Sequence, residues 1–230
     1  MKDKENSEPI SSQAIPEKVK QIMDSAQKTL ARLKELKLPK DLLFQGKFSM
    51  LGTKWNDADS SDDLGEQIQQ SMTMLTTYYA IDYFSDKFKK YEFTICAGDK
   101  NGPDILFEDK SGNVVLCEIF ATNDPYNNEK IFHDLKILAE RSQKYKNKNV
   151  YLYIVFCSPI PLRKTKKSCK AEGIKINRFD DQCTNDQCTD ISYEFAGEKG
   201  FSVRVIHVTP RELQQWAENT WGFPFGERYK

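Results

Sequence analysis

The sequence predicts an α/β fold with a mixed β-sheet, and three observations lead to this prediction. A helical pattern is followed by three strand-like runs, a second helical pattern and a fourth strand-like run. That fourth run, 150–157 (VYLYIVFC), is apolar almost throughout, as is typical of a central strand covered on both faces. One more strand, at 201–208, and a short helix close the chain, and 209–212 (TPRE) fits a capping box at the start of that helix. Helices and strands that alternate in this way indicate an α/β domain.

The length and composition favour one compact domain with an added arm. The chain has 230 residues, enough for a large core, and 39% of them are hydrophobic while 30% are charged. Lys plus Arg and Asp plus Glu both number 34, so the net charge does not indicate a polyanionic partner. No apolar run approaches the roughly 20 residues of a membrane helix, and the N-terminus has no secretory pattern. We therefore expect a cytoplasmic protein with reduced cysteines and no membrane partner.

The first 61 residues are predicted to lie outside the main domain, which spans 62–230. Residues 1–15 are rich in Ser, Glu and Lys and contain few large apolar groups, which predicts a disordered tail. An arm and linker follow at 16–61. Apolar residues recur there at helical spacing, so an amphipathic helix is expected up to Pro39, followed by an irregular linker with one short strand. The helix can pack on the main domain or mediate a homodimer, and the sequence leaves both open.

A long helix is predicted to begin near Asp63 and to end near Lys89. Its buried stripe consists of Leu64, Ile68, Met72, Leu75, Tyr79 and Phe84. Asp63 and Glu66 fit a capping box, in which the two side chains satisfy backbone N–H groups of the first turn. Glu66 has an alternative interpretation, as an accessory carboxylate directed at a metal site from that turn.

Two carboxylates are predicted to meet at one end of a β-hairpin. The strand-like runs 104–109 and 113–121 are joined by a tight turn. Asp104 opens the first strand and Glu118 lies near the end of the second, so the hairpin brings the two side chains together. Paired carboxylates are common protein ligands of Mg²⁺. The sequence therefore predicts a Mg²⁺ site, with Mn²⁺ as the alternative ion, at this end of the hairpin.

The residues of this hairpin match a known family. The segments 102–104 (GPD) and 117–120 (CEIF), set in a helix–strand–strand–strand–helix–strand order, resemble the PD-(D/E)XK superfamily. This superfamily, also called restriction-endonuclease-like, includes type II restriction enzymes, Holliday-junction resolvases and repair nucleases. The resemblance covers about 62–157 and implies a restriction-endonuclease-like mixed sheet with an αβββαβ core. It also implies that Asp104 and Glu118 are catalytic metal ligands, with the Ile119 backbone carbonyl as a third ligand.

One position departs from the family pattern, because the motif lysine is replaced by Phe120. Either another cation has taken its place or the site no longer cuts. The helix predicted at 127–146 offers Lys130, which lies about 100° around the helix from the inward-facing Ile131 and in the first turn. Some members of the superfamily supply the lysine from this helix, so we prefer Lys130 as the catalytic cation. An ordinary i,i+4 ion pair with Asp134 is the alternative.

An insertion at 158–200 carries a strongly basic run. Residues 161–178 hold seven Lys or Arg against one Glu. Such a run is either a solvated loop or a phosphate-binding surface. The candidate nucleic-acid contacts are Arg163, Lys164, Lys166, Lys167 and Lys170. Cys183 and Cys188 follow, but a single C-x₄-C pair is a weak indication of zinc.

The leading hypothesis is a Mg²⁺-dependent DNA endonuclease of the type II restriction-enzyme kind. A catalytically inactive relative that binds nucleic acid or serves in assembly is the first alternative, because of Phe120. An unrelated α/β interaction domain is the second. The separation of the Asp104 and Glu118 carboxyl groups distinguishes the two nuclease-like hypotheses from the last.

Overall fold

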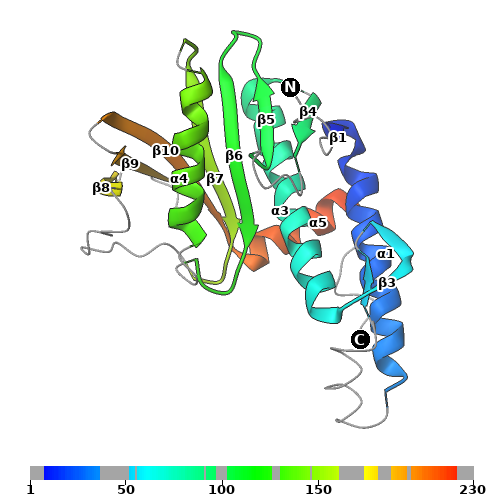
Figure 1. Cartoon of the computed structure of the whole chain (residues 1–230). Helices are drawn as coiled ribbons and strands as arrows, with labels where there is room; N and C mark the ends of the chain where they lie inside the picture. The colour runs from blue at the N-terminus through cyan, green and yellow to red at the C-terminus, as the bar shows by residue number, and fades with distance from the viewer. Residues whose placement is uncertain are drawn as a thin grey trace.

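The computed structural model confirms the α/β class and contains one large mixed sheet with helices on both faces (Figure 1). It describes residues 8–36, 52–54, 56–90, 92–96, 103–125, 130–145, 147–160, 174–180, 188–195 and 198–221. The described helices are α1 (Ile15–Lys34), α3 (Leu64–Phe88), α4 (Lys130–Ser142) and α5 (Pro210–Trp221), with 3₁₀ turns at Ser12–Ala14 and Gln143–Tyr145. The described strands are β1 (Glu8–Ser11), β2 (Gly52–Lys54), β3 (Asp57–Asp62), β4 (Glu92–Ile95), β5 (Ile105–Glu108), β6 (Val114–Ala121), β7 (Val150–Cys157), β8 (Ile174–Asp180), β9 (Cys188–Phe195) and β10 (Glu198–Val208).

The main sheet has the strand order β1-β4-β5-β6-β7-β10-β9-β8 over the described residues. The β6–β7 and β7–β10 pairs are parallel, and the other pairs are antiparallel. The strands β6 and β7 lie at the centre, and nearly all of their residues are buried. This agrees with the apolar sequence of β7, since a central parallel strand must be covered on both faces.

Two hydrophobic clusters lie on opposite faces of this sheet. Alternate residues of β6, such as Cys117 and Ile119, join the cluster that includes α1, α3 and α5. The residues that alternate with them along β6, such as Leu116 and Phe120, pack with α4. The helix α4 is thus the one described helix on its face, whereas three helices cover the other (Figure 1).

The β5–β6 turn fixes the register of the hairpin. The Asp109 side chain accepts hydrogen bonds from the backbone N–H groups of Ser111, at 2.8 Å, and Asn113, at 2.9 Å. Gly112 has φ +79°, a backbone conformation that glycine adopts without steric penalty. The resulting register pairs Ile105 with Cys117. Extending this register by one residue beyond the paired part of β5 places Asp104 opposite Glu118.

Predicted capping residues lie at the N-termini of two helices, α3 and α5. The Asp63 side chain accepts a hydrogen bond from the Glu66 N–H at 3.0 Å, so α3 begins as expected. At α5, the Thr209 hydroxyl accepts from the Glu212 N–H while the Glu212 carboxylate accepts from the Thr209 N–H. This reciprocal pair is a complete capping box and confirms the predicted start of the last helix.

The predicted disordered tail is wrong for residues 8–15. Glu8–Ser11 forms β1 and pairs with β4, and Ile10 and Ile15 are buried in the core. The polar composition concealed a strand of only four residues, whose backbone pairs with the edge of the sheet. The part of the tail before residue 8 lies outside the described residues.

The arm at 16–61 is part of the same core as the main domain. Val19, Ile22 and Met23 of α1 are buried in the cluster that also contains α3 and α5. The predicted packing of this helix on the main domain is therefore confirmed. The linker, expected to be largely irregular, contains the β2–β3 hairpin, which is tied to α1 because the Thr53 hydroxyl donates to the Ser25 carbonyl at 2.7 Å. Homodimer formation stays a prediction.

Candidate functional site

Asp104 lies where β5 begins, and its carboxylate completes the edge of β6. Its Oδ2 accepts a hydrogen bond from the Ile119 N–H at 2.6 Å. The side chain thus occupies the place that a backbone carbonyl would take if β5 continued. This contact places the Asp104 carboxylate beside the backbone of Ile119. The role of the Ile119 carbonyl as a metal ligand stays a prediction.

Glu118 points to the α4 face of the sheet and is buried there. Its neighbours on that side of β6, Leu116 and Phe120, are core residues, so the carboxylate is enclosed by apolar packing. Its Oε1 accepts from Nη1 of Arg141 on α4 at 2.6 Å, and the two side chains are only 6% and 10% exposed. A buried carboxylate is costly unless it is paired, and Arg141 supplies the pairing.

Lys130 occupies the first turn of α4, close to the position of the missing motif lysine. Its Nζ lies 5.5 Å from the centre of the Phe120 ring. It donates to Oδ1 of Asp134 at 2.5 Å, so the predicted alternative, an i,i+4 pair, is present. The Lys130 side chain is nevertheless 43% exposed and can be approached from solvent.

Sequence reasoning missed Asp134 and Arg141 as parts of the site. Both lie on the arc of α4 that also carries Lys130, because residues four and seven positions apart share a helix face. That spacing is the signal in the sequence. It could not show that this arc faces Glu118, because the orientation of a helix over a sheet is set by packing.

Burial raises the pKa of all three carboxylates, and the charge of Asp134 raises the pKa of Asp104 and of Glu118 further. The pKa of Glu118 is raised to about 9, mainly by burial and then by the negative charges of Asp104 and Asp134. The positive charges of Arg141 and Lys130 lower this pKa by a smaller amount. Burial also raises the pKa of Asp104 to about 6, against the hydrogen bond from Ile119 and the charge of Lys130. The pKa of Asp134 is likewise raised by burial, although Lys130 and His133 lower it. Perturbed acids gathered at one place are typical of functional sites.

The donor set suits a hard divalent cation. The described part of the chain contains three carboxylates but two cations in this cluster, and Oδ2 of Asp134 is buried without a hydrogen-bond partner among the described residues. No three His, Cys, Asp or Glu side chains among the described residues lie close enough to bind one ion together. Asp104 and Glu118 remain as a pair, which fits Mg²⁺ because this ion keeps several waters and needs only one or two carboxylates.

Glu66 lies outside this cluster as far as its contacts show. It is exposed on α3, and its Oε1 accepts from Nε2 of Gln70 at 2.7 Å. The Asp63 half of the predicted capping box is present, because the Asp63 side chain accepts from the Glu66 N–H, and the accessory role of Glu66 stays a prediction.

The other predicted contacts fall largely outside the described residues. These include all of the candidate nucleic-acid contacts, Arg163, Lys164, Lys166, Lys167 and Lys170, and also Cys183. Of the other cysteines, Cys96, Cys117 and Cys157 are buried thiols outside any disulfide, as expected for small apolar side chains in strand-like runs. Burial raises the pKa of the Cys157 thiol to about 11 and that of Cys117 upward as well, so neither is a ready nucleophile.

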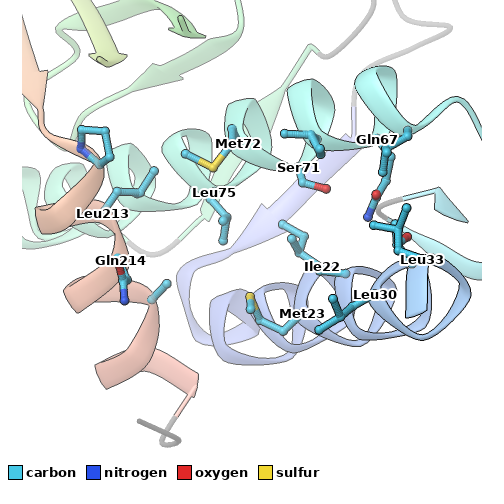
Figure 2. A pocket seen from close by; sticks show the side chains of 16 residues that line it. Ile22, Met23, Leu30, Leu33, Gln67, Ser71, Met72, Leu75, Leu213 and Gln214 are labelled. Carbon is cyan, nitrogen blue, oxygen red and sulfur yellow. The ribbon is translucent and has the colours of Figure 1, made fainter. Parts of the chain in front are cut away.

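A separate apolar cavity of about 580 Å³ lies between α1, α3 and α5 (Figure 2). Ile22, Met23, Leu30, Leu75 and Leu213 are among its lining residues. Figure 2 shows the Ser71 hydroxyl on the α3 side of this space, and the hydroxyl has no hydrogen-bond partner among the described residues. The cavity is on the opposite face of the sheet from Glu118, so the two sites are distinct.

Comparison with family models, with curated proteins and with solved structures finds no match to this chain. None of the helices in the described part of the chain has the length and apolar character needed to cross a bilayer.

Proposed function

We propose that this chain is a divalent-metal-dependent endonuclease that hydrolyses phosphodiester bonds in DNA and has the restriction-endonuclease-like fold. The observation that carries the proposal is the placement of Asp104 opposite Glu118 at the end of the β5–β6 hairpin, with Lys130 alongside. DNA is the substrate that the resemblance of the hairpin to the PD-(D/E)XK superfamily favours.

Asp104 and Glu118 are the residues that would hold Mg²⁺ or Mn²⁺. An ion there would polarise a phosphoryl oxygen and lower the pKa of a water that attacks phosphorus. Asp104 is oriented by its hydrogen bond from Ile119, and Glu118 by the ion pair with Arg141. Both carboxylates are therefore fixed by their surroundings before a ligand arrives, which limits the reorganisation that binding requires.

Lys130 would supply the positive charge that the motif lysine supplies elsewhere. Asp134 holds its ammonium group beside the Phe120 ring, and the side chain is exposed enough to meet a phosphate. A positive charge fixed at this place stabilises negative charge that develops on the phosphoryl oxygens.

Nicking of supercoiled plasmid in Mg²⁺ or Mn²⁺ by the purified full chain tests the proposal. Asp104→Asn and Glu118→Gln preserve side-chain shape and should reduce the rate by at least about 10²-fold. Glu108→Gln is the matched control, because Glu108 is an exposed carboxylate on β5, remote from the site. Equal nicking by the wild type and Asp104→Asn, or no nicking by the wild type, would contradict the proposal.

A second candidate is a catalytically inactive module that binds nucleic acid or serves in assembly. The packing of Phe120 favours it, since the ring stacks on Phe156 at 5.3 Å between centres and lies in the core. Such a module should show no Mg²⁺ or Mn²⁺ binding that depends on Glu118, and any DNA that it binds should stay intact. Calorimetry with the wild type and Glu118→Gln separates the two candidates.

A further inference from the structure

The most unusual carboxylate of the described chain is Asp134. Its side chain is 0% exposed, and its Oδ1 accepts from Nζ of Lys130. His133 Nδ1 lies 3.7 Å from the same Oδ1. Oδ2 accepts no hydrogen bond from any described residue, although it is buried. A buried anionic oxygen without a donor is costly, so its presence calls for a partner other than the described residues, and a bound cation is such a partner.

The position of Asp134 identifies where that partner would be. Lys130, four residues before it, contacts the Phe120 ring, and Arg141, seven residues after it, contacts Glu118. Asp134 therefore lies on the face of α4 that packs over the end of β6. Its charge raises the pKa of both Asp104 and Glu118, as expected for a close neighbour of the two proposed ligands.

The charges of the cluster are also unbalanced. Asp104, Glu118 and Asp134 are acidic, whereas Lys130 and Arg141 are the cations that act on them from the described residues. His133 is an exposed neighbour of Asp134 and contributes positive charge only when it is protonated. With all three carboxylates ionised the cluster would carry one net negative charge, and a bound divalent cation would favour that ionised form.

We propose that Asp134 is an outer carboxylate of the metal site, acting on the divalent ion through its hydration shell while holding Lys130 in place. This inference rests on the proposed function, because it assumes that Asp104 and Glu118 bind the ion. An indirect role agrees with the absence, among the described residues, of three carboxylates close enough for direct binding. Mg²⁺ retains several waters in protein sites, and those waters need acceptors such as Oδ2.

Removal of an outer partner of a metal site weakens the affinity for the metal by about 10- to 100-fold. We therefore expect Asp134→Asn to bind Mn²⁺ about 10- to 100-fold more weakly than the wild type in calorimetry on the full chain. Glu118→Gln should show no measurable binding. Asp86→Asn, which removes an exposed carboxylate from α3, should bind as the wild type does.

The outcomes separate this inference from the proposed function. Binding by Asp134→Asn within about twofold of the wild type would overturn the role of Asp134 and leave the proposed site intact. Loss as complete as in Glu118→Gln would overturn the indirect role, because it would indicate a direct ligand. Absence of Mn²⁺ binding by the wild type would overturn both.

Lys130→Met provides a second test if Asp134→Asn does not fold. The substitution removes the cation from Oδ1 and increases the negative charge available to the ion. Mn²⁺ should then bind more tightly than in the wild type. Equal or weaker binding would overturn the inference that Asp134 contributes its charge to the ion.

Discussion

The two faces of β6 bury different kinds of side chain: apolar residues on one face and an ion pair on the other. Cys117 and Ile119 point into an apolar core beneath α3, whereas Glu118 between them points into a charged cluster beneath α4. The contribution of buried apolar side chains to stability is enough to explain why they are present on the first face. A buried ion pair is often no more stabilising than apolar residues of the same volume, so stability alone does not explain the charged face. The difference favours the proposal that the α4 face binds a ligand.

The apolar face should respond to substitution through lost packing. Phe84 is fully buried and its ring contacts those of Phe107 and Tyr153, with centres 5.7 and 4.9 Å away. We expect Phe84→Ala to lower the free energy of unfolding by about 3–5 kcal/mol, equally at pH 6 and pH 9. Urea denaturation at both pH values measures this. A loss of stability that differs between the two pH values would contradict the view that this face of the sheet is stabilised by apolar packing alone.

On the α4 face of the sheet, substitution of Arg141 should lower stability because it leaves the buried Glu118 without its ion-pair partner. Arg141→Met removes a cation that lowers the pKa of the buried Glu118, and we expect a loss of up to about 3–5 kcal/mol that is largest above pH 9, where the wild-type pair is ionised. The loss should shrink at lower pH, because Glu118 then binds a proton. The double variant Arg141→Met/Glu118→Met should regain most of the loss, since apolar residues can replace a buried pair. If the double variant stays as unstable as the single one, the ion pair has a structural role.

The catalytic contribution of the charged face should depend on Lys130. We expect Lys130→Met to reduce the rate of plasmid nicking by about 10²–10³-fold, as for the loss of one electrostatic donor. Because Asp104 and Glu118 are unchanged, Mn²⁺ binding should persist. Lys136→Met, on the same helix, is the matched control, and an equal reduction there would contradict the assignment.

Stability without metal should decrease with rising pH because of the same cluster. The folded-state pKa values of Asp104 and Glu118, about 6 and about 9, lie above the ordinary values of 3.8 and 4.5. Acids of this kind stabilise the fold below their ordinary pKa, and the stabilisation is lost as pH rises through the folded value. Glu118→Gln should therefore gain in unfolding temperature relative to the wild type between pH 5 and pH 9. The gain should exceed about 3 °C, since one pKa unit is about 1.4 kcal/mol and each kcal/mol is about 2–4 °C.

The smallest effect is expected at an exposed ion pair. Lys148 and Glu108 lie 2.7 Å apart, with side chains 43% and 51% exposed. Lys148→Met should change the free energy of unfolding by no more than about 1 kcal/mol, because solvent screens such pairs. A loss comparable to that of Arg141→Met would show that burial is not what distinguishes the two pairs.

Much of the fold follows from local signals in the sequence. The caps at Asp63 and Thr209 predicted where α3 and α5 begin, and the Asp109 turn fixed a hairpin that the strand pattern had predicted. β1 was missed because four polar-flanked residues carry no periodic signal of their own. Its position depends on the edge of β4, which is 81 residues away at the Ser11–Glu92 pair.

The site was predictable only in part, because local sequence signals set some of its contacts and long-range packing sets the others. The convergence of Asp104 and Glu118 depends on strand register, which the hairpin turn sets locally. The contact of Arg141 with Glu118 depends instead on how α4 is rotated over the sheet. That rotation is set by packing of Ile131, Leu135 and Leu138 against β6 and β7, and no spacing in the sequence encodes it directly.

The hydrogen bond from the Ile119 N–H to Asp104 attaches a proposed metal-binding carboxylate directly to the backbone of β6. The Asp104 carboxylate both extends the pairing of β5 with β6 and is a proposed ligand, so its orientation is set by β6, a central strand that is buried throughout. Changes in the surrounding loops can then alter what enters the site without moving the group that would act on it.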